Sequence, residues 1–300
     1  MSKVTVQSPA NIAFIKYWGV KDANLFLPYN TSISMNLSGC ITTTTAQTNN
    51  SLTEDIIYIK EKDSFIQLPK NVGKNAKAYE QIERLRKITS EQRYLLIHTE
   101  NSFPSDAGIA SSASGFSALT AAVLLTLGRK DLFEDKKELS RLVRLAGSGS
   151  AVRSVYGGFV EFSEGDDQSA VAHQIAPETH WDLVDIIAIV STAKKDTSSS
   201  EGHTRVESSP YFQTRLKELP PRIDSTRKAI LDKKISALGP LIEADTISMH
   251  TVMMTSEPPI YYWQPGTLEV INAVVQWRRE GLENYFSIDA GANVHVICEK

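Results

Sequence analysis

The order of hydrophobic and polar positions divides the chain into a β-rich first part and a helix-rich second part. In the first part, short β-branched runs are separated by turn residues such as Asn49-Asn50. These runs predict strands at 33–37, 41–46, 56–60 and 65–68. The hydrophobic periodicity of the residues that follow predicts a helix at 76–87, a strand at 94–98, helices at 112–127 and 136–146, and a strand at 155–162. The first part is therefore expected to mix strands and helices.

The segment Ser163–Thr179 is rich in Asp, Gln, Ser and Pro and marks a candidate boundary. Beyond it, the pattern predicts a strand at 183–190, helices at 210–219, 222–231, 235–254 and 267–279, and strands at 285–288 and 294–298. Pro220-Pro221 and Pro258-Pro259 are expected to separate these helices, because proline interrupts helical hydrogen bonding. We therefore predict an α+β fold with an N-terminal lobe, 1–172, a C-terminal lobe, 173–300, and an active site in the cleft between them.

Charge and composition exclude several classes of function. The formal net charge is -3 with acids and bases interspersed, so the chain lacks the basic surface that binds nucleic acid. Its longest apolar run, 118–127, is too short to cross a bilayer, and Met1–Val6 lacks the features of a secretory signal. We expect a cytoplasmic protein that binds neither nucleic acid nor membranes.

Metal-ligand patterns are missing from the sequence. The six histidines form no HxxxH or HExxH pattern, and neither Cys40 nor Cys298 has metal-ligand spacing. The expectation is two reduced thiols and no metal held by protein ligands alone.

A loop of small residues at 104–113 leads into the predicted helix at 112–127. Gly108 allows unusual backbone conformations, and the small residues around Ser111 and Ser112 let an anion approach the main chain. The N–H groups at the start of the helix would face such an anion, and Ser112 is placed to touch a magnesium ion carried by a nucleotide. This is not a Walker loop, since GxxxxGK[ST] is absent. The alternative is a plain loop capped by Ser111 or Ser112.

Lys16 and Asp289 are ionisable residues in apolar surroundings. Lys16 lies in the strand-like run 12–18, where a buried lysine needs an acidic partner. Asp289 follows an apolar strand and precedes small residues, so it is placed to face a cleft and to accept a hydroxyl proton. The alternatives are a lysine that reaches the surface and an aspartate that forms an Asx-turn.

The segment 147–158 combines small residues with one arginine. Arg153 is a planar, permanently charged group suited to a carboxylate, and Ser148 and Ser150 could add hydroxyl donors beside it. The alternative is a glycine-rich turn with a surface arginine.

Together these segments resemble the diphosphomevalonate decarboxylase family. The matching motifs are ANIAxIKYWG, FPxxAGxASSAxG, GSGSAxRSxYGGFVE and DAGxN, and the similarity extends from about Ser8 to Asn293. The resemblance implies the two-lobed fold of the galactokinase, homoserine kinase, mevalonate kinase and phosphomevalonate kinase (GHMP) superfamily. It also implies phosphorylation of the C3 hydroxyl of a mevalonate derivative by ATP with Mg²⁺, followed by loss of phosphate and CO₂.

The resemblance assigns roles to matching positions. Asp289 would deprotonate or orient the C3 hydroxyl, with Lys16 beside it, and Arg153 would hold the substrate carboxylate with Ser148 and Ser150. Tyr17 and Ala290 would line the substrate pocket. The residues expected to hold the nucleotide phosphates are Ser105, Gly108, Ser111 and Ser112.

One departure from the family pattern concerns the substrate. The family motif continues KYWGK, and its last lysine contacts the 5-diphosphate, but this chain has Val20 followed by Lys21. A lost charged hydrogen bond costs about 1.5–3 kcal/mol, which disfavours a terminal phosphate. The predicted substrate is therefore mevalonate 5-phosphate, giving isopentenyl phosphate. The alternatives are decarboxylation of mevalonate 5-diphosphate, a mevalonate 3-kinase without elimination, and a non-catalytic ligand-binding relative. The family likeness also suggests a homodimer.

Overall fold

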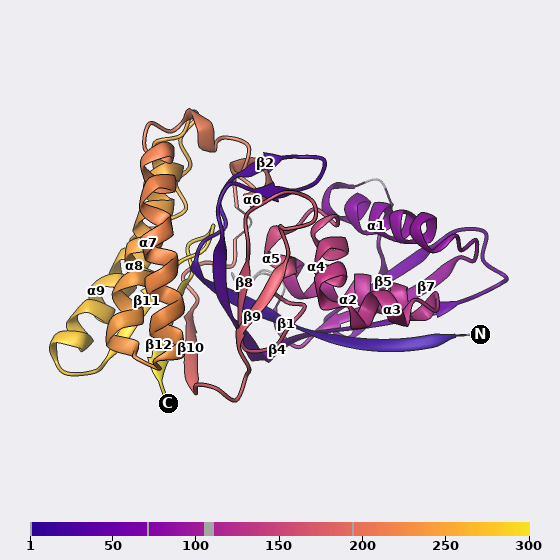
Figure 1. The fold of residues 1–300 in the computed structure, drawn as a ribbon, viewed down its shortest axis with the longest axis horizontal. Helices are drawn as coiled ribbons and strands as arrows, with labels where there is room; N and C mark the ends of the chain where they lie inside the picture. Colours follow the sequence, from indigo (N-terminus) through magenta and orange to yellow (C-terminus); the bar gives the residue numbers. More distant parts are fainter. Residues whose placement is uncertain (1, 71, 105–110, 194) are drawn as a thin grey trace.

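The computed structural model describes residues 2–70, 72–104, 111–193 and 195–300, and two separate sheets organise them (Figure 1). The large sheet has seven strands in the order β6-β5-β7-β4-β8-β9, with β1 paired to β4. Its strands are β1 (Lys3–Ile15), β4 (Ser32–Thr48), β5 (Ile56–Glu61), β6 (Ser64–Gln67), β7 (Leu95–Asn101), β8 (Phe159–Phe162) and β9 (Ala172–Ala176). The short strands β2 (Val20–Asp22) and β3 (Leu27–Pro28) form a separate ribbon.

Strand β4 is one strand of 17 residues, whereas the pattern predicted two strands at 33–37 and 41–46. Between the two predicted strands, the register of β4 with β1 shifts: Pro9 pairs with Ile41, but the next residue, Ala10, pairs with Leu37. Such a shift bends a strand pair without ending it. The C-terminal half of β1 is thereby continuously buried, and Lys16 follows directly after it.

Helices cover the large sheet. They are α1 (Gly73–Thr89), α2 (Ser111–Thr126), α3 (Lys130–Glu134), α4 (Lys136–Arg144) and α5 (Gly149–Val152). Helix α2 is buried along almost its whole length and packs against β1 and β4, which its small residues permit. The predicted helix at 112–127 is thus present, shifted by one residue.

The small sheet has the antiparallel order β10-β12-β11, with β10 (Leu183–Ala188), β11 (Asn284–Ser287) and β12 (Val294–Glu299). One face, with Tyr285 and Ile297, joins the core that contains Ile12 and Phe14 of β1. The alternate residues of these strands, such as Phe286 and Val296, project from the opposite face and pack against α9. The period of two along the strands therefore lays this sheet against β1 on one side and against a helix on the other.

The remaining helices are α6 (Ser199–Gly202), α7 (Phe212–Leu231), α8 (Ile235–Met254) and α9 (Pro265–Arg279), and η1 (Val206–Ser208) is a single 3₁₀ turn. In Figure 1, α7, α8 and α9 stand side by side at the end of the molecule that carries the small sheet. The predicted α8 has the same bounds as the observed helix.

The prediction that Pro220-Pro221 separates two helices is wrong, because α7 runs through both prolines. Both prolines are exposed, so the carbonyl groups that lose their N–H partners can bond to water. Leu219 and Ile223, on either side, are buried and keep the helix packed on α8.

Two further observations concern the described residues as a whole. Within them, we find no helix of the length and apolar character needed to cross a membrane. Cys40 and Cys298 are both half-buried and form no disulfide.

Candidate active site

Lys16 and Asp289 meet where β1 lies against the small sheet. Lys16 Nζ donates to Asp289 Oδ1 at 2.6 Å and to Ser287 Oγ at 2.6 Å. Ser287 Oγ in turn donates to the carbonyl oxygen of Ala13 at 3.0 Å. The lysine side chain is 2% exposed and the aspartate side chain is 31% exposed, so only the carboxylate is open to a ligand. The predicted pairing of these two residues is present in the structure.

The carboxyl group of Asp289 is held in its charged form. Burial by itself would raise its pKa, but the positive charges of Lys16, His295 and Arg153 outweigh burial and lower the pKa below its ordinary value. A carboxylate that is ionised and partly exposed can accept a proton from a hydroxyl group.

The peptide group of Lys16 is fixed from both sides. Its N–H donates to Asp245 Oδ2 at 2.7 Å, and its carbonyl oxygen accepts from Asn30 Nδ2 at 3.1 Å and Arg215 Nη2 at 3.3 Å. These contacts join the end of β1 to helices α7 and α8. They fix the backbone position from which the lysine side chain extends.

Asp245 belongs to a buried charge network that the sequence analysis did not identify. Arg215 donates to its two carboxylate oxygens at 3.1 and 3.2 Å, and Arg222 donates to Oδ1 at 3.3 Å. Asp245 is completely buried, and Arg215 is nearly so. The sequence did contain a signal for this network: Asp245 stands among apolar residues of the predicted helix at 235–254, and a buried charge requires a partner.

Arg153 ends the short helix α5 and points into the interior. It is 3% exposed, and its Nη1 donates to Ser32 Oγ at 2.5 Å. Burial lowers its pKa to about 10, and the negative charge of Asp289 acts in the opposite direction. Its Nε has no hydrogen-bond partner among the described residues, so the guanidinium retains a donor for an anion.

The serines of the predicted carboxylate site lie next to this arginine in the chain. Ser148 Oγ and Ser150 Oγ are 3.1 Å apart, and Gly149 lies between them. A Cβ on Gly149 would come within 2.6 Å of the Tyr17 ring, so glycine permits the tyrosine to pack against this segment. Burial raises the pKa of Tyr17 despite the nearby charge of Arg153, so the phenol stays protonated.

His203 is a further residue that the sequence analysis missed. Its ring lies 4.6 Å from the ring of Tyr17 and 4.6 Å from that of Trp18, measured between centroids. Nδ1 accepts the backbone N–H of Gly19 at 2.9 Å. Burial, with a smaller contribution from Lys77, lowers its pKa to about 3. The imidazole is therefore neutral and joins α6 to the segment that follows β1.

The loop after Asp289 is held by polar contacts. The carbonyl oxygen of Ala290 accepts from Lys195, and Ala290 packs against the apolar cluster that contains Trp18. Asn293 Oδ1 accepts the backbone N–H groups of Val190 and Ser191 at 2.8 and 2.9 Å. The DAGAN motif thus places the aspartate and then anchors the chain before β12.

Two families of domain sequences cover this chain. Residues 8–172 match the diphosphomevalonate decarboxylase-like N-terminal domain, and residues 185–300 match the mevalonate 5-diphosphate decarboxylase C-terminal domain. The chain belongs to the diphosphomevalonate decarboxylase family.

Individual relatives agree over nearly the whole chain. A diphosphomevalonate decarboxylase of Candida albicans (strain SC5314 / ATCC MYA-2876) is 38% identical over an alignment of 314 positions, which covers 100% of this chain and 85% of the relative. Mevalonate diphosphate decarboxylase from Staphylococcus aureus superposes with a TM-score of 0.91 at 33% identity, covering 100% of this chain and 88% of that one. The complex described as "MDDEF in complex with MVAPP, AMPPCP and Magnesium" gives a TM-score of 0.89 at 34% identity, covering 100% and 89%. The predicted family and its α+β fold of the GHMP type are confirmed.

The nucleotide residues expected for a diphosphomevalonate decarboxylase are only partly described. Ser105 and Gly108 lie outside the described residues. Ser111 and Ser112 form the first turn of α2 and are half-buried, and the first turn of that helix contains no acidic residue. Among the described residues, no group of three or more His, Cys, Asp or Glu side chains is arranged to hold a metal ion.

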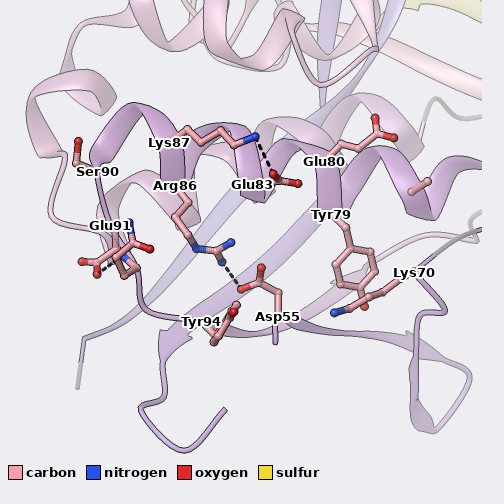
Figure 2. Close-up of a pocket in the computed structure, with 12 residues that line it drawn as sticks. Asp55, Lys70, Tyr79, Glu80, Glu83, Arg86, Lys87, Ser90, Glu91 and Tyr94 are labelled. Carbon is pink, nitrogen blue, oxygen red and sulfur yellow. Dashed lines mark hydrogen bonds and ion pairs between the residues drawn. The ribbon is translucent and has the colours of Figure 1, made fainter. Parts of the chain in front are cut away.

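A groove of about 840 Å³ lies elsewhere on this decarboxylase-family protein, along α1 (Figure 2). It shares no residue with the site around Lys16 and Asp289. Figure 2 shows two ion pairs between its side chains, one between Arg86 and Asp55 and one between Lys87 and Glu83. The groove is therefore a surface feature separate from the candidate active site.

Proposed function

We propose that this protein catalyses the ATP-dependent decarboxylation of mevalonate 5-diphosphate to isopentenyl diphosphate. The observation that carries the proposal is the buried ion pair between Lys16 and Asp289, from which only the carboxylate is exposed. A kinase-like reaction on a tertiary alcohol needs a group of this kind, because the hydroxyl must lose its proton as it attacks phosphorus.

ATP and Mg²⁺ are the proposed co-reactants. One of the solved relatives is a complex with AMPPCP and magnesium. The fit in this chain rests on the first turn of α2, where Ser111 and Ser112 and the start of a 16-residue helix offer hydroxyl and N–H donors to a phosphate. When bound, ATP supplies the phosphoryl group and magnesium neutralises part of its charge.

Asp289 accepts the proton of the C3 hydroxyl. Lys16 orients the carboxylate through the 2.6 Å contact, while Ser287 holds the other side of the ammonium group. Since the lysine is buried, its charge is poorly screened and stabilises the negative charge that develops at the reacting oxygen.

Arg153 holds the carboxylate of the substrate, with Ser148 and Ser150 as neighbouring donors. The unpaired Nε and the buried setting favour binding of an anion there, because a guanidinium shielded from water gains most from a carboxylate partner. Phosphorylation makes the C3 oxygen a good leaving group. Departure of that phosphate and cleavage of the carboxylate C–C bond then release CO₂ and form the double bond.

The two candidate substrates differ in the group on C5, which is a diphosphate in one and a monophosphate in the other. The expectation of mevalonate 5-phosphate rested on Val20, which is half-buried in β2 and carries no charge, with Lys21 exposed beside it. The relatives described above are diphosphate decarboxylases, and one is a complex with MVAPP. These observations support the diphosphate over the monophosphate.

The deciding experiment is a parallel assay with mevalonate 5-diphosphate and mevalonate 5-phosphate, each with ATP and Mg²⁺, in which ADP and CO₂ are both measured. We expect equal amounts of ADP and CO₂ and a higher kcat/KM for the diphosphate. A higher kcat/KM for the monophosphate would restore the original prediction. ADP without CO₂ would indicate a 3-kinase, and no turnover by either the native protein or Asp289→Asn would indicate a binding protein.

The homodimer, the cytoplasmic location and the division at 172/173 stay predictions. Strand β9, which spans that division, pairs with β8 in the large sheet, and β10 is the first strand of the small sheet. Light scattering of the purified protein would measure the subunit number directly.

A further inference from the structure

A further buried ion pair lies on the small sheet. His295 Nδ1, on β12, is 2.8 Å from Asp185 Oδ2, on β10, and each side chain is 2% exposed. Asp185 Oδ1 has no hydrogen-bond partner among the described residues. Buried ion pairs stabilise a fold little more than apolar residues of similar size, so stability alone does not account for this one.

The strand register places this pair beside the candidate active site. His295 lies directly opposite Ser287 on β11, and directly opposite residues of an antiparallel pair project from the same face of the sheet. That face lies against β1, and Ser287 Oγ on it accepts from Lys16 Nζ. His295 is therefore on the side of the sheet that holds Lys16 and, through Lys16, Asp289.

The charges around His295 come from three elements. Asp185 on β10 and Asp289 after β11 favour the charged imidazolium, while Lys16 after β1 opposes it. Burial also opposes the charge, yet the net effect is a raised pKa for His295. The charge of Asp185 also acts on the thiols of Cys40 on β4 and Cys298 on β12, whose pKa values are raised first by burial and then by this carboxylate.

Another buried histidine, His250, is affected by the charges of Lys16 and Asp289 but is itself uncharged. His250 Nε2 lies 3.4 Å from the carbonyl oxygen of Ile288, and burial, reinforced by Lys16, lowers its pKa to about 3. The two histidines thus differ in having or lacking a carboxylate partner.

We propose that the Asp185–His295 pair is a positioning device that keeps a second positive charge behind Asp289 during the reaction. The inference rests on the proposed function, in which Asp289 accepts a proton. Arg153 also favours the ionised form of Asp289, but its charge is engaged once the substrate carboxylate binds. Without His295, Lys16 would then be the one positive charge left among the described residues to offset the burial of the Asp289 carboxylate and the negative charge of the approaching phosphates. The imidazolium of His295 does not contact the substrate, so its charge remains available throughout.

The test compares His295→Gln, which removes the charge, with His295→Lys, which restores one. Carbon-13 NMR of labelled aspartate measures the carboxyl pKa of Asp289 without any need for turnover. We expect the pKa in His295→Gln to rise by about one unit, as for loss of a nearby opposite charge, and to fall back in His295→Lys. His250→Gln is the matched control and should leave the carboxyl pKa unchanged.

Kinetics give the second readout. Asp289 must be ionised to act, so its lowered pKa places the loss of activity at low pH. A raised pKa in His295→Gln moves the acidic limb of kcat upward by about one pH unit, equivalent to an about tenfold lower rate on that limb. KM for the substrate should change little, because His295 lies behind the carboxylate.

Several results would overturn the inference. It is wrong if His295→Lys behaves like His295→Gln, or if His250→Gln shifts the carboxyl pKa equally. Should His295→Gln fail to fold, Asp185→Asn provides the same test, because His295 then loses its anionic partner and its charge; an unchanged pKa for Asp289 would refute the role. Absence of turnover in the unaltered protein would refute the proposed function, whereas the carboxyl titration would still decide the electrostatic role.

Discussion

Asp245 accepts the backbone N–H of Lys16 at 2.7 Å, although 229 positions separate the two residues in the sequence. The aspartate is completely buried in α8 and is held by Arg215 of α7. The position of the lysine that contacts Asp289 is thus fixed by helices α7 and α8. This relationship makes the buried network a testable part of the active site.

Asp245→Asn should lower both activity and stability. The amide leaves Arg215 without a full counter-charge, and breaking a buried pair in this way costs about 3–5 kcal/mol. Urea denaturation would measure the loss of stability, and kcat should fall because the Lys16 peptide is no longer held. The double variant Arg215→Met with Asp245→Leu separates the two effects: we expect most of the stability to return without the activity. Full recovery of kcat in the double variant would show that the network has no positioning role.

Asp289→Ala should reduce kcat by about 10²–10⁴-fold, the usual contribution of a general base. ATP should still bind, because the proposed phosphate residues lie at the start of α2, and nucleotide binding can be followed by calorimetry. Lys16 would lose its partner in this variant, so thermal unfolding should be recorded alongside. Native rates in Asp289→Ala would remove this residue from the mechanism.

Gly149→Ala should raise KM for the substrate. The new Cβ would come within 2.6 Å of the Tyr17 ring, and relief of that overlap must displace the ring or the backbone that carries Ser148 and Ser150. Overpacking of this kind destabilises a protein by about 1–3 kcal/mol. Gly115→Ala in α2 is the matched control, since nothing lies within 4 Å of its Cβ position, and there alanine should be neutral or stabilising by up to about 1 kcal/mol. Equal effects of the two substitutions would contradict the packing explanation.

Val20→Lys should increase the preference for the diphosphate. A new charged hydrogen bond of about 1.5–3 kcal/mol corresponds to an about tenfold or greater rise in the ratio of kcat/KM for the diphosphate to that for the monophosphate. Val20→Met changes the side chain without adding charge and serves as the control. An unchanged ratio in Val20→Lys would mean that this position does not contact the 5-substituent.

The motifs near Lys16, Arg153 and Asp289 allowed the family and the meeting of Lys16 with Asp289 to be predicted from sequence. Regular periodicity was equally informative for α8, whose bounds match the prediction. Local rules failed at Pro220-Pro221, because an exposed kink site is tolerated when buried neighbours hold the helix in place.

The buried networks could not be predicted in the same way. Asp245 and Arg215 lie on different helices, and Asp185 and His295 on different strands, so no spacing along the chain reveals either pair. Each pair depends on how α7 packs on α8 or on the register of the small sheet. Buried charge without an obvious neighbour was the only sequence signal, and it identifies the residue but not its partner.

Lys16 leaves the ribosome early, whereas Asp289 follows it 273 positions later. A nascent chain therefore cannot form the Lys16–Asp289 pair until synthesis has passed Asp289 and the small sheet has docked on β1. A polypeptide cut before β11 would keep Lys16, Ser148, Ser150 and Arg153 but would lack Asp289, and with it the proposed acceptor of the hydroxyl proton.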